Sequence, residues 1–130
     1  MKEHLNAITE RIIGSAIEVH RTLGPGMLES AYDSCLAFEL ADRGVRDERQ
    51  KPMPVAYRGR SLDIGYRLDL LVEDQVVVEV KAIERLEAVH SAQVLSYLKL
   101  SGCKVGLLIN FNAKWLTQDG TKRIVNGFPD

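Results

Sequence analysis

The chain has 130 residues, of which 45% are hydrophobic and 27% are charged, a composition typical of a globular domain and not of a disordered segment. Its 17 Lys and Arg residues nearly balance 18 Asp and Glu residues, so the net charge of −1 argues against a histone-like nucleic-acid binder. The two cysteines form no Cys-x-x-Cys motif, which excludes a disulfide framework and a cysteine-rich zinc site.

The N-terminal segment carries Glu3 and Glu10 and has no continuous apolar core, so it does not have the pattern of a signal peptide. No stretch approaches the roughly 18 consecutive apolar residues that a membrane-spanning helix needs. We therefore expect a cytoplasmic protein whose single domain covers residues 1–130.

The first part of the chain has the apolar spacing of two helices. Over residues 5–23, apolar side chains recur at steps of three and four, which places them on one helix face. A Gly-Pro-Gly turn at residues 24–26 ends this helix, because proline lacks a backbone donor. A second helix is predicted over residues 28–43, with Gly44 as its capping glycine. The expected buried face of this helix consists of Leu28, Ala31, Cys35 and Phe38.

The middle of the chain is rich in β-branched residues, which favours strands. Prolines flank the start of the first predicted strand, so we expect it at a sheet edge. The predicted strands cover residues 53–57, 62–72 and 76–80, with turns at Arg58-Gly59-Arg60 and Glu73-Asp74-Gln75.

The last third returns to a helical period over residues 86–100, ending at Gly102. A buried strand over residues 105–109, an irregular segment over residues 111–120 and a short final strand over residues 123–128 follow. The order α-α-β-β-β-α-β predicts an α/β fold in which helices flank a central mixed sheet. The 86–100 helix is expected to cross over to a parallel strand.

Asp69, Glu79 and Lys81 are charged residues within predicted strands. Strand alternation places Glu79 and Lys81 on the same face. If the turn is centred on Asp74, residue 72 pairs with residue 76 and Asp69 falls opposite Glu79, with Cβ atoms about 4.5–5.5 Å apart. Two carboxylates at that distance repel each other, so the pair calls for a shared proton or a cation, for which Mg²⁺ or Mn²⁺ is the natural choice.

The same charges also fit two arrangements that need no cation. In the first, the strand register slips by one residue, so that the two acids no longer face each other. In the second, Lys81 pairs with one acid at a solvated strand end.

Two helix segments carry further polar residues. His90, Gln93 and Tyr97 share one face of the 86–100 helix, either as a solvent-facing stripe or as hydrogen-bonding groups that orient a lysine or a phosphate. Glu29 lies in the first turn of its helix, where the helix dipole favours an acid. Tyr32, one turn later, is expected in the core.

These residues resemble the motifs of a known family. Gly26, Glu29 and Tyr32 match the G-x-x-E-x-x-Y signature of the small GxxExxY proteins, which belong to the PD-(D/E)xK nuclease superfamily. The other matching motifs are Asp69 for the metal-binding Asp, Glu79-Val80-Lys81 for E-x-K, Gln93 and Tyr97 for the Q-x-x-x-Y motif of RecB-like nucleases, and GLLINF over residues 106–111. The motifs occur in the family's order over residues 8–123, with Leu68 where the superfamily pattern has proline.

The resemblance implies a restriction-endonuclease-like fold and metal-dependent hydrolysis of phosphodiester bonds in nucleic acid, with DNA favoured. It implies that Glu29, Asp69, Glu79 and the Val80 carbonyl hold Mg²⁺ or Mn²⁺. In the implied mechanism, Lys81 positions or deprotonates the attacking water, and Gln93 and Tyr97 orient Lys81 or a phosphate.

Contact with nucleic acid needs local positive charge, because the chain as a whole is nearly neutral. Lys51, Arg58 and Arg60 cluster around the first predicted hairpin and are candidate phosphate contacts, although a solvated surface accounts for them equally well. A second copy of the chain or a partner protein would add contact surface. The alternative functions are a catalytically silent nucleic-acid-binding module and a partner-binding protein of the defence or toxin–antitoxin type.

Overall fold

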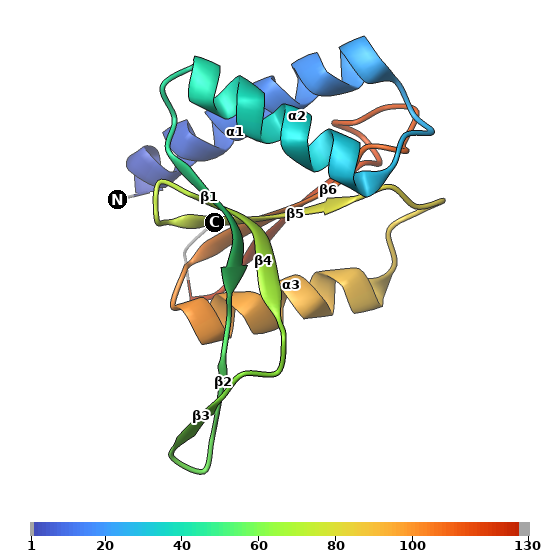
Figure 1. The fold of residues 1–130 in the computed structure, drawn as a ribbon. Helices are drawn as coiled ribbons and strands as arrows, with labels where there is room; N and C mark the ends of the chain where they lie inside the picture. Colours follow the sequence, from blue (N-terminus) through green and yellow to red (C-terminus); the bar gives the residue numbers. More distant parts are fainter. Residues whose placement is uncertain (1, 128–130) are drawn as a thin grey trace.

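Residues 2–127, described in a computed structural model of the chain, form a mixed sheet between two layers of helix (Figure 1). Helices α1 and α2 cover one face of the sheet, and α3 covers the other. The elements in chain order are α1 (Lys2–Leu23), α2 (Glu29–Asp42), β1 (Asp47–Pro52), β2 (Val55–Tyr57), β3 (Arg60–Leu62), β4 (Arg67–Val72), β5 (Val76–Lys81), α3 (Ala88–Ser101), β6 (Val105–Asn110) and β7 (Thr121–Val125). The expected α/β architecture is confirmed.

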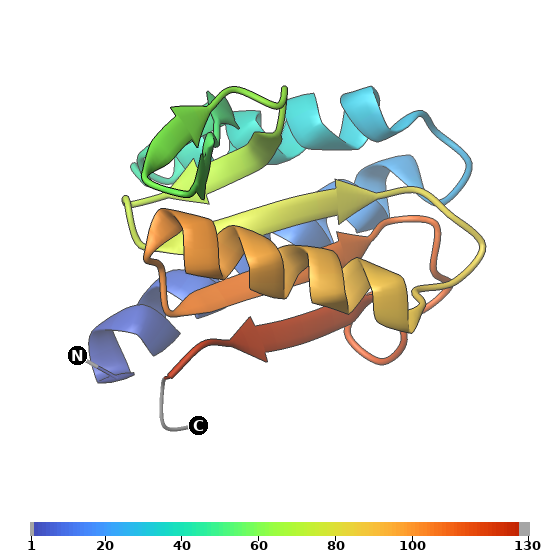
Figure 2. The same ribbon diagram turned by 90° about the horizontal axis from the view of Figure 1, so that it is seen from below.

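The main sheet has the strand order β1-β4-β5-β6-β7. Strands β5 and β6 are parallel, whereas the other neighbouring pairs are antiparallel. Helix α3 connects β5 to β6 and covers one face of the sheet (Figure 2). The predicted crossover to a parallel strand is therefore confirmed. Within the described residues, no helix combines the length and the apolar composition needed to cross a bilayer.

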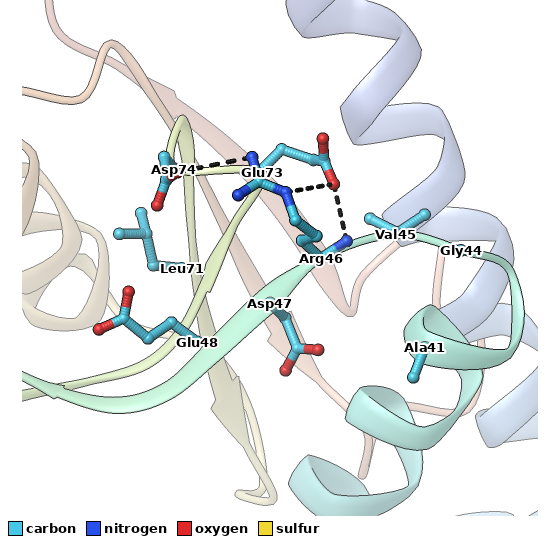
Figure 3. Close-up of a pocket in the computed structure, with 9 residues that line it drawn as sticks. All are labelled: Ala41, Gly44, Val45, Arg46, Asp47, Glu48, Leu71, Glu73 and Asp74. Carbon is cyan, nitrogen blue, oxygen red and sulfur yellow. Dashed lines mark hydrogen bonds and ion pairs between the residues drawn. The ribbon is translucent and has the colours of Figure 1, made fainter.

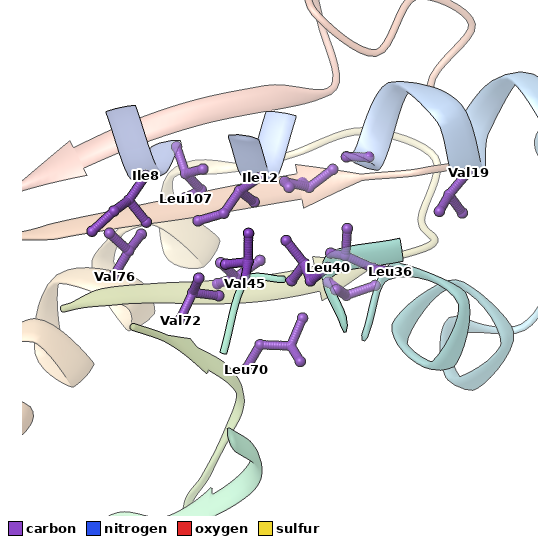
Figure 4. Packing of buried hydrophobic residues seen from close by; sticks show 14 of the residues in the cluster. Ile8, Ile12, Val19, Leu36, Leu40, Val45, Leu70, Val72, Val76 and Leu107 are labelled. Carbon is purple, nitrogen blue, oxygen red and sulfur yellow. The ribbon is translucent and has the colours of Figure 1, made fainter. Parts of the chain in front are cut away.

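Two apolar layers hold the helices against the sheet. On one side, residues from α1 and α2, such as Ile12 and Leu36, pack with Leu70 and Leu107 of the strands (Figure 4). On the other side, Val94 and Leu98 of α3 pack against Val77 and Leu108. Gly106 allows the close approach of α3 to β6, since a Cβ atom at this position would lie 2.8 Å from Val94 Cγ1.

The predicted buried face of α2 is wrong. Leu28 and Phe38 are 77% and 71% exposed, and Ala31 and Cys35 are only partly buried. The face that packs on the sheet instead consists of Tyr32, Asp33, Leu36 and Leu40. This face includes a charged residue, so apolar spacing alone points to the wrong side of the helix. The expectation that Tyr32 lies in the core is confirmed, and its ring stacks on Phe111 with centroids 4.8 Å apart.

The strand predictions need three corrections. The sequence pattern does not predict β1, because DERQKP has no apolar alternation and joins the sheet edge through backbone pairing with β4. The predicted edge strand at residues 53–57 instead contributes β2, which pairs with β3 in a two-stranded hairpin separate from the main sheet. The predicted strand 62–72 is divided between β3 and β4, separated by residues 63–66.

The hairpin turn predicted at Arg58-Gly59-Arg60 is confirmed. Arg58 and Gly59 have φ values of 51° and 77°, the left-handed conformation of a tight two-residue hairpin turn. At the other end of the chain, the last strand covers Thr121–Val125 and not residues 123–128, of which residue 128 lies outside the described residues.

Candidate active site

The register between β4 and β5 brings two acidic residues together. Val72 pairs with Val76 and Leu70 with Val78, which confirms the predicted pairing and excludes a slip of one residue. At the next pair of positions, side-chain carboxylates accept hydrogen bonds from backbone N–H groups of the neighbouring strand. The Asp69 N–H donates to Glu79 Oε1 at 3.3 Å, and the Val80 N–H donates to Asp69 Oδ2 at 2.8 Å. The two carboxyl groups therefore lie side by side between neighbouring strands.

Glu79 is an acid in a strongly unfavourable place for a charge. It is only 4% exposed, and burial is the largest cause of a pKa that rises from 4.5 to about 9. The charge of Asp69 and a side-chain hydrogen bond with it raise the pKa further, whereas the Lys81 ammonium opposes the rise. At neutral pH the pair therefore retains a proton unless a cation takes its place.

Lys81 ends β5 and is held by its backbone. It pairs with Asn110 of β6, and its carbonyl accepts a hydrogen bond from the Phe111 N–H at 2.9 Å. The buried Asn110 side chain then fixes the chain beyond β5, since it accepts from the Ile83 N–H at 3.0 Å and donates to the Ile83 carbonyl at 2.9 Å. The lysine therefore extends from a rigid strand end, which suits a group that must be positioned accurately.

Helix α3 places Tyr97 against the charged face of β5. Tyr97 is buried, and its hydroxyl accepts a hydrogen bond from Gln93 Nε2 at 3.2 Å. Burial first, and then the charge of Glu79, raise the pKa of the Tyr97 hydroxyl. Tyr97 thus lies within electrostatic range of Glu79 and Asp69, and Gln93 is linked to them only through Tyr97. The chemical roles of both residues stay predictions.

The histidines have structural contacts. His90 Nδ1 accepts a hydrogen bond from the Glu87 N–H at 2.8 Å and so caps α3. His20 Nε2 lies 2.7 Å from the Ala113 carbonyl oxygen. Neither contact reaches the acidic pair.

A pocket of about 230 Å³ opens on the α2 side of the acidic pair. It is lined by Glu29, Ser30, Asp33, Gln50, Asp69 and Val80. Glu29 and Val80, both expected as metal ligands from the family resemblance, therefore share a pocket with Asp69, and Glu29 is exposed to solvent. Their role as ligands stays a prediction.

Asp33, which lines the same pocket as Asp69, is a buried acid that the sequence patterns do not single out. It is 7% exposed, and burial is the main cause that raises the pKa of its carboxyl group, with Asp69 adding to the rise and Arg49 opposing it. A signal is present in the sequence, because Glu29 and Asp33 are spaced i, i+4 and so share a helix face.

Tyr32 of the G-x-x-E-x-x-Y motif holds the loop that precedes α2. Its hydroxyl donates to the Gly24 carbonyl and accepts from the Met27 N–H at 3.0 Å. The Gly26 N–H donates to Asn112 Oδ1 at 2.9 Å, which ties the same loop to the segment after β6. These bonds fix the start of α2 and therefore the position of Glu29.

The candidate phosphate contacts are spread over two regions. Lys51 lies on β1 and forms an ion pair with Glu48 at 3.1 Å. Arg58 and Arg60 lie on the β2–β3 hairpin, which projects from the sheet in Figure 1, and the Arg58 guanidinium stands 5.9 Å from the centre of the Tyr57 ring. The structure does not bring these two arginines into contact with the acidic pair.

A larger pocket of about 540 Å³ lies beside the β4–β5 turn (Figure 3), and neither Asp69 nor Glu79 lines it. Its acidic lining residues are Asp47, Glu48, Glu73 and Asp74. Arg46 is engaged by two of them, since its Nε lies 3.8 Å from Glu73 and its Nη2 3.6 Å from Asp74. This acidic lining repels phosphates. The pocket is therefore a poor candidate for the active site, although it is larger than the pocket beside Asp69.

The donors around Asp69 suit a hard divalent cation. Within residues 2–127, no three Asp, Glu, His or Cys side chains stand close enough to form a ready-made metal site. Mg²⁺ does not require one, because it commonly binds through one or two carboxylates and keeps several waters. The oxygen atoms of this kind near Asp69 are the carboxylates of the Asp69–Glu79 pair and the buried Oδ1 of Asp33, which has no hydrogen-bond partner among the described residues.

Two neighbouring strands that present an acidic pair and a lysine, in a mixed sheet between helices, define a restriction-endonuclease-like fold. A model of the PD-(D/E)XK nuclease superfamily matches residues 6–124, and the chain belongs to this superfamily. Searches of curated proteins and of solved structures found no match.

Proposed function

We propose that the protein is a divalent-cation-dependent nuclease that hydrolyses phosphodiester bonds in nucleic acid, with DNA as the preferred substrate. We also assign it to the GxxExxY proteins within the superfamily. The observation that carries the proposal is the Asp69–Glu79 pair, whose second carboxyl group has a pKa raised to about 9 with a lysine two residues further along the same strand. Folding gains nothing from this arrangement, whereas a cation site requires it.

In this proposal, Asp69, Glu79 and the Val80 carbonyl hold Mg²⁺ or Mn²⁺, with Glu29 at the edge of the same pocket. When bound, the cation would lower the pKa of a water and would offset the charge that grows on the phosphate. Lys81 orients or deprotonates the attacking water, and its ammonium stabilises the phosphate oxygens in the transition state. Tyr97, held by Gln93, offers its hydroxyl to Lys81 or to a phosphate oxygen.

Substrate contact is assigned to Lys51 and to the exposed hairpin that carries Arg58 and Arg60. An arginine beside an exposed tyrosine can bind a phosphate while the ring contacts a sugar or a base. A second copy of this chain or a partner protein would extend this surface.

Cleavage assays with single- and double-stranded DNA and RNA test the proposal, each run with Mg²⁺, Mn²⁺ or EDTA. We expect cleavage that EDTA abolishes and that Glu79→Gln and Lys81→Met each reduce by at least about a hundredfold. Glu84→Gln is the matched control, because Glu84 is exposed and lies just beyond β5.

Two results would contradict the nuclease. Metal-independent binding without cleavage would indicate a silent nucleic-acid-binding module. A protein that neither binds nor cleaves nucleic acid would indicate the partner-binding function.

A further inference from the structure

Asp33 has a carboxylate oxygen that nothing in the fold satisfies. Its Oδ1 is shut off from solvent and has no hydrogen-bond partner among the described residues. An unsatisfied buried polar group costs on the order of 1–3 kcal/mol, and more when it carries a charge. An apolar side chain such as Leu would avoid this cost, so the position indicates a ligand for the free oxygen.

The second oxygen of Asp33 is held only loosely. Oδ2 lies 3.5 Å from Arg49 Nη2 and 3.4 Å from Gln50 Nε2. Both distances are at the long end for hydrogen bonds, and the Arg49 side chain is half exposed. Arg49 and Gln50 therefore orient the carboxylate through Oδ2 and leave Oδ1 unsatisfied.

Asp33 and Asp69 face the same pocket from different elements. Asp33 comes from α2, where Glu29 lies one turn earlier on the same side, and Asp69 comes from β4. Gln50 adds an amide from β1, at the position where the backbone pairing of β1 with β4 is interrupted and where the glutamine φ is 50°. The pocket is thus surrounded by oxygen donors from three elements.

We propose that Asp33 is a ligand of a divalent cation in this pocket, sharing the carboxylate of Asp69 on the α2 side of the sheet. The cation satisfies the buried Oδ1 and offsets the repulsion between Asp33 and Asp69. The donors line a pocket of about 230 Å³, which has room for an ion that keeps part of its water shell. The inference rests on the proposed function, because Asp69 also belongs to the pair with Glu79.

Mn²⁺ binding to the full chain, followed by electron paramagnetic resonance without nucleic acid, tests this proposal. Asp33→Asn keeps the size of the side chain and removes its charge, so we expect it to fold and to bind Mn²⁺ at least about tenfold more weakly, or to lose one bound ion. Asp42→Asn is the matched control, since Asp42 is exposed on the same helix, and it should bind Mn²⁺ as the wild type does.

The outcomes separate this proposal from the nuclease itself. An unchanged Mn²⁺ isotherm for a folded Asp33→Asn variant overturns the role of Asp33, even if Glu79→Gln abolishes cleavage. A wild-type protein that binds Mn²⁺ through Asp33 but cleaves nothing supports the site and refutes the nuclease. A wild type that binds no Mn²⁺ at millimolar concentration overturns both.

Discussion

Replacing Glu79 with Gln removes one charge from the buried pair and leaves the shape of the side chain nearly unchanged. The amide oxygen can still accept from the Asp69 N–H, and the amide group can donate to the Asp69 carboxylate. We therefore predict that Glu79→Gln stabilises the metal-free protein at alkaline pH while it abolishes cleavage.

The size of this effect follows from the raised pKa. The folded state holds the Glu79 proton more tightly than the unfolded chain does, because the pKa rises from 4.5 to about 9 on folding. The contribution to stability is thus greatest below pH 4.5 and declines as the pH rises towards 9. At about 1.4 kcal/mol per pH unit above 4.5, the loss by pH 8 is of the order of 5 kcal/mol. Glutamine does not titrate and avoids this loss.

Urea denaturation in EDTA between about pH 5 and pH 8 measures the difference. The advantage of Glu79→Gln over the wild type should be small at the acidic end and grow steadily with pH, whereas the exposed control Glu84→Gln should follow the wild type. Adding Mn²⁺ at pH 8 should stabilise the wild type more than the variant. A difference between variant and wild type that stays constant with pH would refute the reasoning.

Three further predictions test the supporting structure. Tyr32→Phe keeps the stacked ring but loses the hydrogen bonds that hold the loop before α2. Urea denaturation should therefore show a loss of about 1–2 kcal/mol in stability, and cleavage should weaken. A variant with unchanged stability would mean that these hydrogen bonds do not hold the loop. Gly106→Ala would place a Cβ atom 2.8 Å from Val94 Cγ1. We expect the same assay to show a loss of about 1–3 kcal/mol in stability. An unchanged stability would show that α3 moves away from β6 at no cost. Joint replacement of Arg58 and Arg60 by Ala should weaken DNA binding and lower the slope of log affinity against log salt by about 1–2. An unchanged slope in salt titrations would remove the hairpin from the binding surface.

The central part of the fold follows closely from the sequence because several local signals agree there. The β-branched run of β5 predicts a buried strand, and the polar turn centred on Asp74 sets its register with β4. The helical spacing after residue 86 then requires the crossover to β6. Since register alone decides which residues face each other, the position of Asp69 beside Glu79 is predictable from the turn.

The parts that the sequence does not predict depend on contacts between distant segments. β1 has a polar sequence and exposed side chains, so only the neighbouring backbone of β4 makes it a strand. On α2, apolar spacing favours Phe38, but the helix buries Asp33 instead, because Asp33 shares the helix face of Leu36 and Leu40 that packs on the sheet. A buried acid contradicts the hydrophobic pattern, and such exceptions gather at functional sites.

The most direct test of the proposed cation site is an anomalous X-ray map of crystals soaked in Mn²⁺. We predict a manganese peak within coordination distance of the carboxylate oxygens of both Asp69 and Glu79. Ordered carboxylates without a manganese peak between them, in crystals of a protein that cleaves DNA, would contradict this prediction.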